Sequence, residues 1–288
     1  MDIKEWESKG QYLDFKGNDI FYVEEGKGEV IIAIHGFPTS SWDWHKVWPS
    51  LTSQYRVLAP DLLGYGYSDK PKIKYKMAMQ ADLIEHILME KGIKACHILA
   101  HDYGDTVVQE LLARYRSRPD QTFTIKSVCL LNGGIFPESN TPRPIQKLLA
   151  SSFGPIIGKF INFKRFSKSF SEIFAKDKKP GDEELEQFWS LITYKEGNKI
   201  SHRVIQYLKE RWEFHQRWSE ALTKSTVPQM LIIGPEDPVS GQSIADRYKE
   251  IVPNPNVVIL DGVGHYPQVE DPEGTLSNYL KFIGELSD

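Results

Sequence analysis

The chain has 288 residues, of which 40% are hydrophobic and 26% are charged. This length suits one large domain or a core domain with an insert, and this composition excludes a disordered or fibrous chain. The net charge is −4, and no run of like charge is long enough for a nucleic-acid-binding tail. We therefore expect no nucleic acid partner.

The cysteine content and the apolar runs predict a cytoplasmic protein without a stable membrane span. Only two cysteines are present, too few for a disulfide framework. Residues 1–11 are charged and lack the apolar segment of a signal peptide, and no apolar run approaches the ~20 residues of a membrane-spanning helix. The dense basic stretch 159–179 alternates with phenylalanines. Such a pattern occurs in membrane-surface helices, but we interpret it as one inserted helix with a solvated face.

The first half of the chain predicts a hairpin followed by alternating strands and helices. Alternating polarity over Tyr12–Phe15 and Ile20–Glu24, around a Gly-Asn turn, predicts the β-hairpin. Continuous apolar runs are typical of parallel strands buried on both faces. These runs are Val30–Ile34, Val57–Ala59, Ala95–Ala100 and Ile125–Leu131, and helical periodicity covers Tyr75–Lys91 and Asp105–Arg116.

The pattern changes after residue 134. Between residues 135 and 226 helical periodicity dominates, aromatic residues are dense and no strong strand is found. Strands resume at Gln229–Ile233 and Val257–Leu260, and helices are predicted at Gln242–Ile251 and Pro272–Leu286. We therefore predict an α/β core domain of residues 1–134 and 227–288, with residues 135–226 inserted as a helical cap.

The turn between the strand Ala95–Ala100 and the next helix is the strongest candidate for a catalytic residue. A nucleophile elbow needs small residues two positions before and two after the nucleophile. Ala100 and Gly104 meet this requirement around Asp102. A plain helix N-cap explains an Asp at this position equally well.

Two later residues favour the catalytic interpretation. Asp237 follows the strand Gln229–Ile233, and His265 lies in the loop after Val257–Leu260. The order nucleophile, acid, histidine is that of an α/β-hydrolase triad, and the carboxyl ends of parallel strands are where ligands bind. We therefore predict a triad of Asp102, Asp237 and His265.

The same reasoning predicts an oxyanion hole. Such a site needs two backbone N–H donors, and we expect them at Phe37, within His-Gly-Phe-Pro, and at Tyr103, directly after the predicted nucleophile. Gly36 allows a sharp turn before Phe37, and Pro38 restricts the backbone after it. His35 and Pro38 are expected at the substrate pocket, with His35 as a hydrogen-bonded framework residue.

Five motifs stand out along the chain: HGFP (35–38), PDLLGYGYSDKP (60–71), HDYG (101–104), GPEDP (234–238) and GHYPQVEDP (264–272). These motifs resemble those of the epoxide hydrolase and haloalkane dehalogenase branch of the α/β-hydrolase fold, and within it the mesoderm-specific transcript proteins. The resemblance implies an eight-stranded, mostly parallel sheet, an inserted helical cap and an Asp nucleophile.

An Asp nucleophile implies attack at carbon. A carboxylate, with an unperturbed pKa of about 3.9, is ionised at neutral pH and can displace a leaving group from sp³ carbon. The product is an ester of Asp102. His265 would activate the water that hydrolyses this ester, with Asp237 holding the imidazole.

The leaving group decides between two enzyme classes. Dehalogenases bind halide through side-chain N–H donors beside the nucleophile, and neither Phe37 nor Tyr103 offers one. Epoxide hydrolases of this branch use cap tyrosines as acids, and the candidates here are Tyr207, which we prefer, and Tyr194. Three cap tryptophans, Trp189, Trp212 and Trp218, are candidate pocket residues.

We therefore expect an epoxide hydrolase that converts an epoxide and water to a vicinal diol without cofactor or metal. Its expected substrate is a small apolar organic molecule, and its expected state is a monomer or homodimer. A haloalkane or haloacid dehalogenase, and a non-catalytic ligand-binding protein with the same fold, remain the alternatives.

Overall fold

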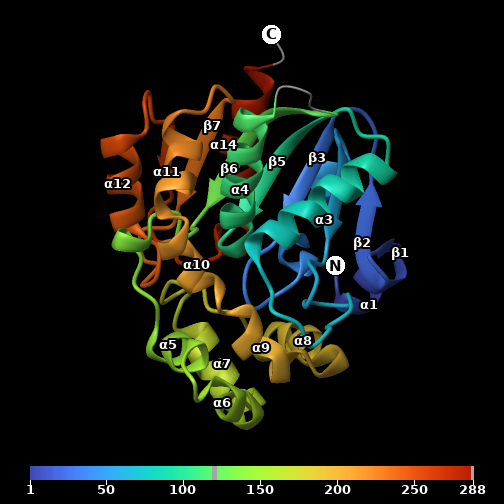
Figure 1. Ribbon diagram of the computed structural model, residues 1–288, viewed down its shortest axis with the longest axis vertical. Helices are drawn as coiled ribbons and strands as arrows, with labels where there is room; N and C mark the ends of the chain where they lie inside the picture. Colours follow the sequence, from blue (N-terminus) through green and yellow to red (C-terminus); the bar gives the residue numbers. More distant parts are fainter. Residues whose placement is uncertain (119–121, 287–288) are drawn as a thin grey trace.

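A mixed β-sheet lies at the centre of the computed structural model, which describes residues 1–118 and 122–286 (Figure 1). Its order is β1-β2-β4-β3-β5-β6-β7-β8. The pairs β1–β2 and β2–β4 are antiparallel and the remaining pairs are parallel, so the predicted eight-stranded, mostly parallel sheet is confirmed. The strands are β1 (Gly10–Phe15), β2 (Asn18–Glu25), β3 (Val30–Ile34), β4 (Arg56–Pro60), β5 (Ala95–His101), β6 (Thr124–Leu131), β7 (Gln229–Ile233) and β8 (Val257–Ile259).

The sequence explains these strands locally. The β1–β2 turn places Lys16 at φ 55° and Gly17 at φ 78°, and two positive φ values match the right-handed twist of a tight hairpin. The central strands lack polar alternation because both faces are covered. Residues 31–34 of β3 are completely buried, as a parallel strand between two helical layers requires.

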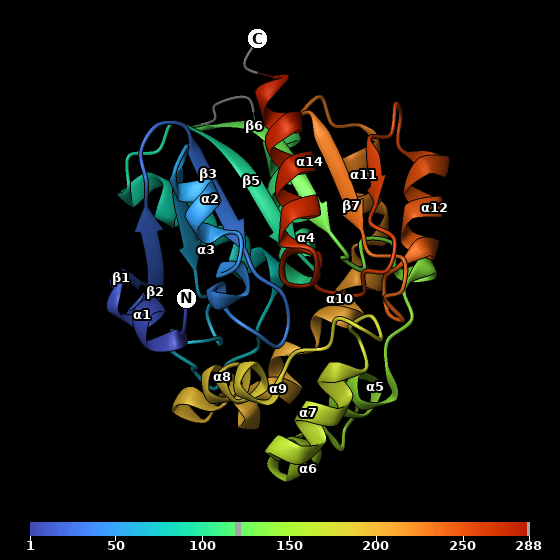
Figure 2. The ribbon, with the colours of Figure 1, turned by 180° about the vertical axis from the view of Figure 1, so that it is seen from behind.

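Helices pack against both faces of the sheet (Figures 1 and 2). Apolar side chains from α3, α4 and α12 form one core, and those from α1, α2 and α14 form the other. These helices are α1 (Ile3–Ser8), α2 (Trp48–Thr52), α3 (Met77–Glu90), α4 (Tyr103–Ser117), α12 (Gln242–Ile251) and α14 (Pro272–Gly284), and the short η1 (Ser41–Trp44) and α13 (Pro267–Glu270) lie in loops.

The segment between β6 and β7 is helical, as expected. In Figures 1 and 2, α5 to α9 cover the end of the sheet to which the parallel strands point. The elements are η2 (Pro137–Ser139), α5 (Pro144–Ala150), α6 (Gly154–Phe160), α7 (Phe163–Ser171), α8 (Asp182–Thr193), η3 (Tyr194–Glu196), α9 (Gly197–Val204), α10 (Tyr207–Glu213) and α11 (His215–Thr223). The division of the chain at 134/135 and 226/227 into two domains stays a prediction.

Two details of this segment differ from expectation. The basic stretch 159–179 is not one helix, because α6 ends at Phe160 and Asn162 starts α7 by accepting a hydrogen bond from the Arg165 N–H at 3.0 Å. Helix α11 packs beside the core helix α4, where the Trp218 indole donates to Glu110 at 2.9 Å. Within residues 1–118 and 122–286, no helix is both long and apolar enough to cross a membrane.

Candidate active site

Asp102 occupies a strained turn between β5 and α4. Its φ of 47° and ψ of −101° fall outside the regions that side-chain-bearing residues favour, which costs about 1–3 kcal/mol. The turn needs the glycine at 104, because a Cβ there would lie 2.4 Å from the Ile34 carbonyl oxygen. This geometry is that of a nucleophile elbow, with the side chain raised at the carboxyl end of the sheet.

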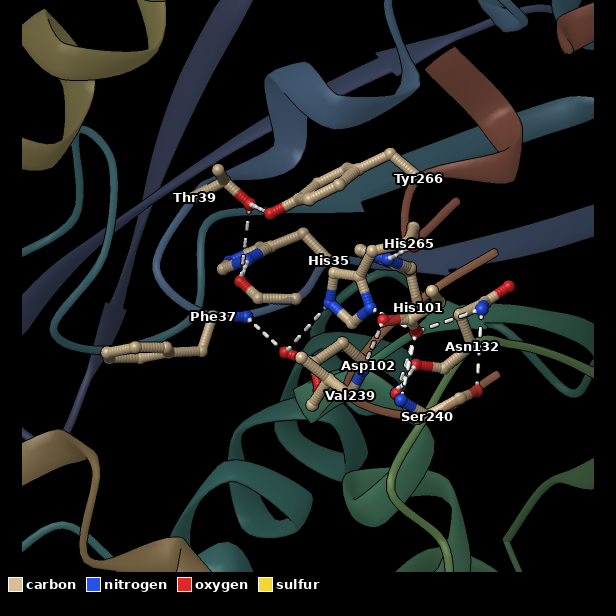
Figure 3. Close-up of polar contacts among 12 residues, drawn as sticks. His35, Phe37, Thr39, His101, Asp102, Asn132, Val239, Ser240, His265 and Tyr266 are labelled. Atoms are coloured by element: carbon tan, nitrogen blue, oxygen red, sulfur yellow. Dashed lines mark hydrogen bonds and ion pairs between the residues drawn. The ribbon is translucent and has the colours of Figure 1, made fainter. Parts of the chain in front are cut away.

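The loop after β3 closely approaches this turn. A Cβ at Gly36 would lie 2.7 Å from His101 Nδ1 and 3.0 Å from Asp102 Cβ, so glycine permits the approach. The Phe37 N–H then donates to Asp102 Oδ2 at 3.1 Å (Figure 3). Tyr103 is the first residue of α4, and its N–H therefore has no partner inside the helix. The structure thus places the two expected oxyanion donors at the ends of two adjacent strands.

Asp237 follows β7 and is held by several donors. Its Oδ1 accepts the Val239 N–H at 2.7 Å, and its Oδ2 accepts the Ser240 N–H at 3.1 Å and the Asn132 amide at 3.0 Å. The same Oδ2 lies 2.7 Å from His265 Nδ1. These contacts fix the carboxylate and orient the imidazole (Figure 3).

His265 joins the two carboxylates, since its Nε2 lies 3.9 Å from Asp102 Oδ2. Burial opposes the imidazolium, but the negative charges of Asp237 and Asp102 outweigh burial and raise the pKa of His265 to about 9. Burial also disfavours the Asp237 anion, but the charge of His265 and the hydrogen bonds to the carboxylate lower its pKa. The structure therefore brings the three predicted triad residues together as one buried, coupled group.

The loop that carries His265 is pinned to the segment after α7. Glu270 accepts three backbone N–H groups, from Gly264 at 2.7 Å, Tyr266 at 2.9 Å and Ala175 at 2.8 Å. The His265 N–H donates to the Ile173 carbonyl at 2.9 Å. Sequence reasoning missed Glu270, although it lies in the GHYPQVEDP motif.

A second residue that sequence reasoning missed is Arg211 of α10. Its Nη2 lies 3.5 Å from Asp102 Oδ1 and donates to the Asp102 carbonyl at 3.3 Å, and its Nε donates to Thr106 Oγ1 at 2.9 Å. The side chain is buried, which is rare for arginine unless it is paired. Arg211 therefore couples the inserted helices to the elbow.

Asp105 lies in the first turn of α4, close behind the elbow. Its side chain is completely buried, and burial together with the charge of Asp102 raises its pKa well above the ordinary value. Burial and the neighbouring Asp102 thus both disfavour the charged form of the Asp105 carboxyl.

A cavity of about 350 Å³ reaches His265 of the triad. Its floor includes His265, Phe37, Pro38 and Val239, and its walls come mainly from α5 to α9. The wall side chains are largely apolar and include the expected Trp189, which packs on Phe163 and Phe166. Within the described ranges, no group of three or more His, Cys, Asp or Glu residues is arranged to hold a metal ion.

Tyr207 lies beside the elbow. Its ring packs 5.9 Å from that of Phe37 and 4.9 Å from that of Tyr103, measured between centroids. Its buried hydroxyl has no hydrogen-bond partner in the part of the chain that the structure describes. Burial and the charge of Asp102 raise its pKa well above the ordinary value, so the hydroxyl keeps its proton.

The second candidate proton donor and one framework residue lie elsewhere. The Tyr194 ring packs on Tyr67 at 4.9 Å and lies under the Lys70 amine at 5.3 Å. Neither Tyr194 nor Tyr207 is among the cavity-lining residues described. His35 is completely buried and its Nε2 accepts the Leu62 N–H at 3.0 Å. His35 therefore supports the loop before Phe37 and does not face the pocket.

The expectation that Trp212 and Trp218 line the substrate pocket is not supported by their placement. Trp212 is 61% exposed on α10. Trp218 is buried against α4, where its indole N–H is used by Glu110. Periodicity predicts the apolar face of a helix, but it does not identify the surface on which that face packs.

The geometry agrees with the comparisons. The family model for the alpha/beta hydrolase fold matches residues 29–272. The mesoderm-specific transcript homolog protein of Bos taurus is 41% identical over 99% of this chain and 88% of its own length.

Two solved structures share the fold. The haloalkane dehalogenase DatA of Agrobacterium tumefaciens has a TM-score of 0.81 and 21% identity, over 96% of this chain and 97% of its own. The epoxide hydrolase CorEH has a TM-score of 0.78 and 18% identity, over 96% and 99%. The chain therefore belongs to the alpha/beta hydrolase fold family, and within it to the relatives of the mesoderm-specific transcript proteins.

Proposed function

We propose that this protein hydrolyses small apolar epoxides to vicinal diols through an ester formed on Asp102. One observation carries the proposal. The elbow holds a carboxylate in place of a hydroxyl or thiol, with one oxygen 3.1 Å from the Phe37 nitrogen and 3.9 Å from His265 Nε2. A carboxylate attacks sp³ carbon directly and leaves an ester that an activated water hydrolyses.

In the first step an Asp102 oxygen bonds to an epoxide carbon, the carbon–oxygen bond breaks, and its electron pair goes to the epoxide oxygen. Tyr207 gives its proton to this alkoxide. The charge of Asp102 contributes to the raised pKa of Tyr207. Because the charge disappears as the ester forms, the phenol becomes a better acid as the reaction proceeds.

Between the two steps the protonated His265 gives its proton to the Tyr207 phenolate, because the ester no longer carries the Asp102 charge that helps to raise the pKa of His265. In the second step the neutral His265 takes a proton from water, and the hydroxide attacks the carbonyl carbon of the Asp102 ester. The N–H groups of Phe37 and Tyr103 stabilise the oxyanion. Collapse breaks the acyl bond, and the diol oxygen takes the proton of the new carboxylic acid. His265 keeps the proton that it took from water, which restores every group to its resting state. Arg211 favours this step because it pairs with the carboxylate that is regenerated.

The polar groups near Asp102 support an epoxide over a halide. A departing halide needs N–H donors, but the side chains of Phe37 and Tyr103 supply none, and the Trp218 indole is bound to Glu110. The apolar walls of the cavity suit a small, weakly polar molecule.

The test traps the ester. The His265→Gln variant is incubated with panels of epoxides and haloalkanes, and the peptide that contains Asp102 is weighed by mass spectrometry. The expected result is a mass increase equal to one epoxide. An alkyl adduct from a haloalkane would support a dehalogenase instead.

The controls define the remaining outcomes. The double variant Asp102→Asn/His265→Gln should give no adduct, because the amide is not a nucleophile. Wild-type protein should give diol and no lasting adduct. If neither panel labels the single variant, the proposal is wrong and a ligand-binding role is favoured.

A further inference from the structure

The tip of the inserted segment exposes a cluster of large apolar side chains. Leu148, Phe153, Ile156 and Phe160 are 41%, 62%, 55% and 62% exposed, and all fall in α5, α6 and the turn between them. The remaining exposed large apolar side chains that the structure describes are scattered over the chain. Single exposed apolar residues need no explanation, whereas a contiguous patch marks an interaction site.

The same segment is strongly basic. Residues 139–171 contain six basic residues and no acidic residue, namely Arg143, Lys147, Lys159, Lys164, Arg165 and Lys168. Because the chain carries −4 overall, the residues outside this stretch together carry −10. This strong charge asymmetry favours a partner of negative charge.

Most of these cations are not neutralised within the protein. Arg143 pairs with Glu172, but none of the four lysines forms an ion pair with any residue in 1–118 or 122–286. Lys147, Lys159, Lys164 and Lys168 are all exposed. They are therefore available to an external anion.

The exposed apolar cluster and the basic residues around it also reach the cavity. Leu148, Phe160, Arg143 and Arg165 line the same cavity as His265. In Figures 1 and 2, α5, α6 and α7 form the end of the molecule farthest from the C-terminus, and they project beyond the sheet. A flat surface can therefore reach the patch without contacting the core.

We propose that α5, α6 and α7 form a docking surface for an anionic lipid bilayer, onto which the cavity opens. Projecting Phe and Ile side chains flanked by lysines are the pattern of an interfacial segment, whose apolar groups enter the headgroup region while its cations face anionic lipid. Protein–protein interfaces are depleted in lysine, which favours lipid over a protein partner. The binding is peripheral and requires no spanning helix.

The test measures flotation of the full chain with vesicles of phosphatidylcholine, with or without about one third phosphatidylserine. Binding is expected only with phosphatidylserine, and it should weaken as salt is raised because the attraction is screened. Phe153→Ser/Ile156→Ser and Lys159→Glu/Lys164→Glu should each lower the partition coefficient roughly tenfold or more. None of these four residues lines the cavity.

Control variants change one exposed apolar residue and one exposed lysine at the far end of the sheet. Met89 is 65% exposed in α3, and Lys94 lies just before β5. Neither Met89→Ser nor Lys94→Glu should change binding to the vesicles. Thermal unfolding of each variant shows whether it folds.

The proposal is overturned by equal binding to both kinds of vesicle, by no binding to either, or by folded patch variants that bind like wild type. It is also overturned if the protein is a dimer that Phe153→Ser/Ile156→Ser dissociates, because the patch then joins two copies. The assay involves no turnover, so its result is independent of the proposed epoxide chemistry.

Discussion

The floor and the roof of the cavity are built in different ways. The triad at the floor, Asp102, Asp237 and His265, is almost completely buried, and its polar atoms are held by hydrogen bonds from the surrounding loops. The roof, formed by α5 to α9, consists of short helices joined by turns, and it exposes large apolar side chains such as Phe153 and Phe160.

This difference separates two tasks. A reacting group must stay within a few tenths of an ångström of its position, which requires buried, fully partnered polar atoms on rigid elements. A substrate-admitting surface must instead contact varied apolar molecules. The floor therefore sets the chemistry and the roof sets access, and Arg211 and Tyr207 of α10 are where the two meet.

The largest effect should follow from a change in the floor. Asp237→Asn removes the charge that raises the pKa of His265 to about 9, so turnover should fall by on the order of 10³ to 10⁴. The raised pKa also stabilises the fold; this contribution is complete below about pH 6.5 and is lost as the pH rises through about 9. Wild-type protein should therefore lose more unfolding free energy than Asp237→Asn between pH 7 and 10.

Urea denaturation at the two pH values measures this difference. Equal losses of unfolding free energy in wild type and Asp237→Asn would show that Asp237 does not control the protonation of His265. The exposed Asp177→Asn serves as the control for a lost carboxylate.

A smaller effect is expected where α10 supplies the acid at the boundary between floor and roof. Tyr207→Phe should lower epoxide turnover by about 10², which is the lower range for loss of a general acid. Tyr248→Phe is the matched control, because Tyr248 is also buried with a hydroxyl that has no partner in the described chain, and it packs near Phe136 on the core. Steady-state kinetics with one epoxide compares the two. Equal turnover in the two variants would remove Tyr207 from the mechanism.

The smallest effect should come from Arg211→Met. Esterification removes the negative charge that Arg211 faces and hydrolysis restores it, so loss of the guanidinium should slow ester breakdown about tenfold, the size of one charged hydrogen bond. Rapid-quench mass spectrometry should then show the Asp102 ester accumulating in the first turnover. If diol release and ester breakdown stay at wild-type rates, Arg211 is structural only. Arg217 pairs with Glu110 from the exposed side. The Arg217→Met variant is therefore the control for loss of an arginine away from Asp102.

The sequence predicted the core because buried parallel strands have a local signal. Continuous apolar runs predict the boundaries of β3 and β7 to within one residue. The order Asp102, Asp237, His265 follows from the motifs at the strand ends. The cap had no comparable signal. Its short helices are set by local caps such as Asn162, and several of its side chains face unexpected neighbours.

Arg211 shows why such residues escape prediction. It lies in Lys-Glu-Arg-Trp-Glu, a charged run typical of an exposed helix, yet it is the arginine that is buried and the adjacent Trp212 that is 61% exposed. Arg211 is buried because it pairs with Asp102, which lies more than a hundred residues away in the chain. Only the tertiary fold brings these charges together.

The three hydrogen bonds accepted by Glu270 have a mechanical consequence. They tie the base-bearing loop to Ala175, and the His265 N–H is tied to Ile173. An outward movement of the segment after α7 would break these anchors and let the His265 loop move relative to Asp237. Under the proposed mechanism, water would then be activated only while this segment is in place, and an ester exposed by an early opening would persist until the segment returned.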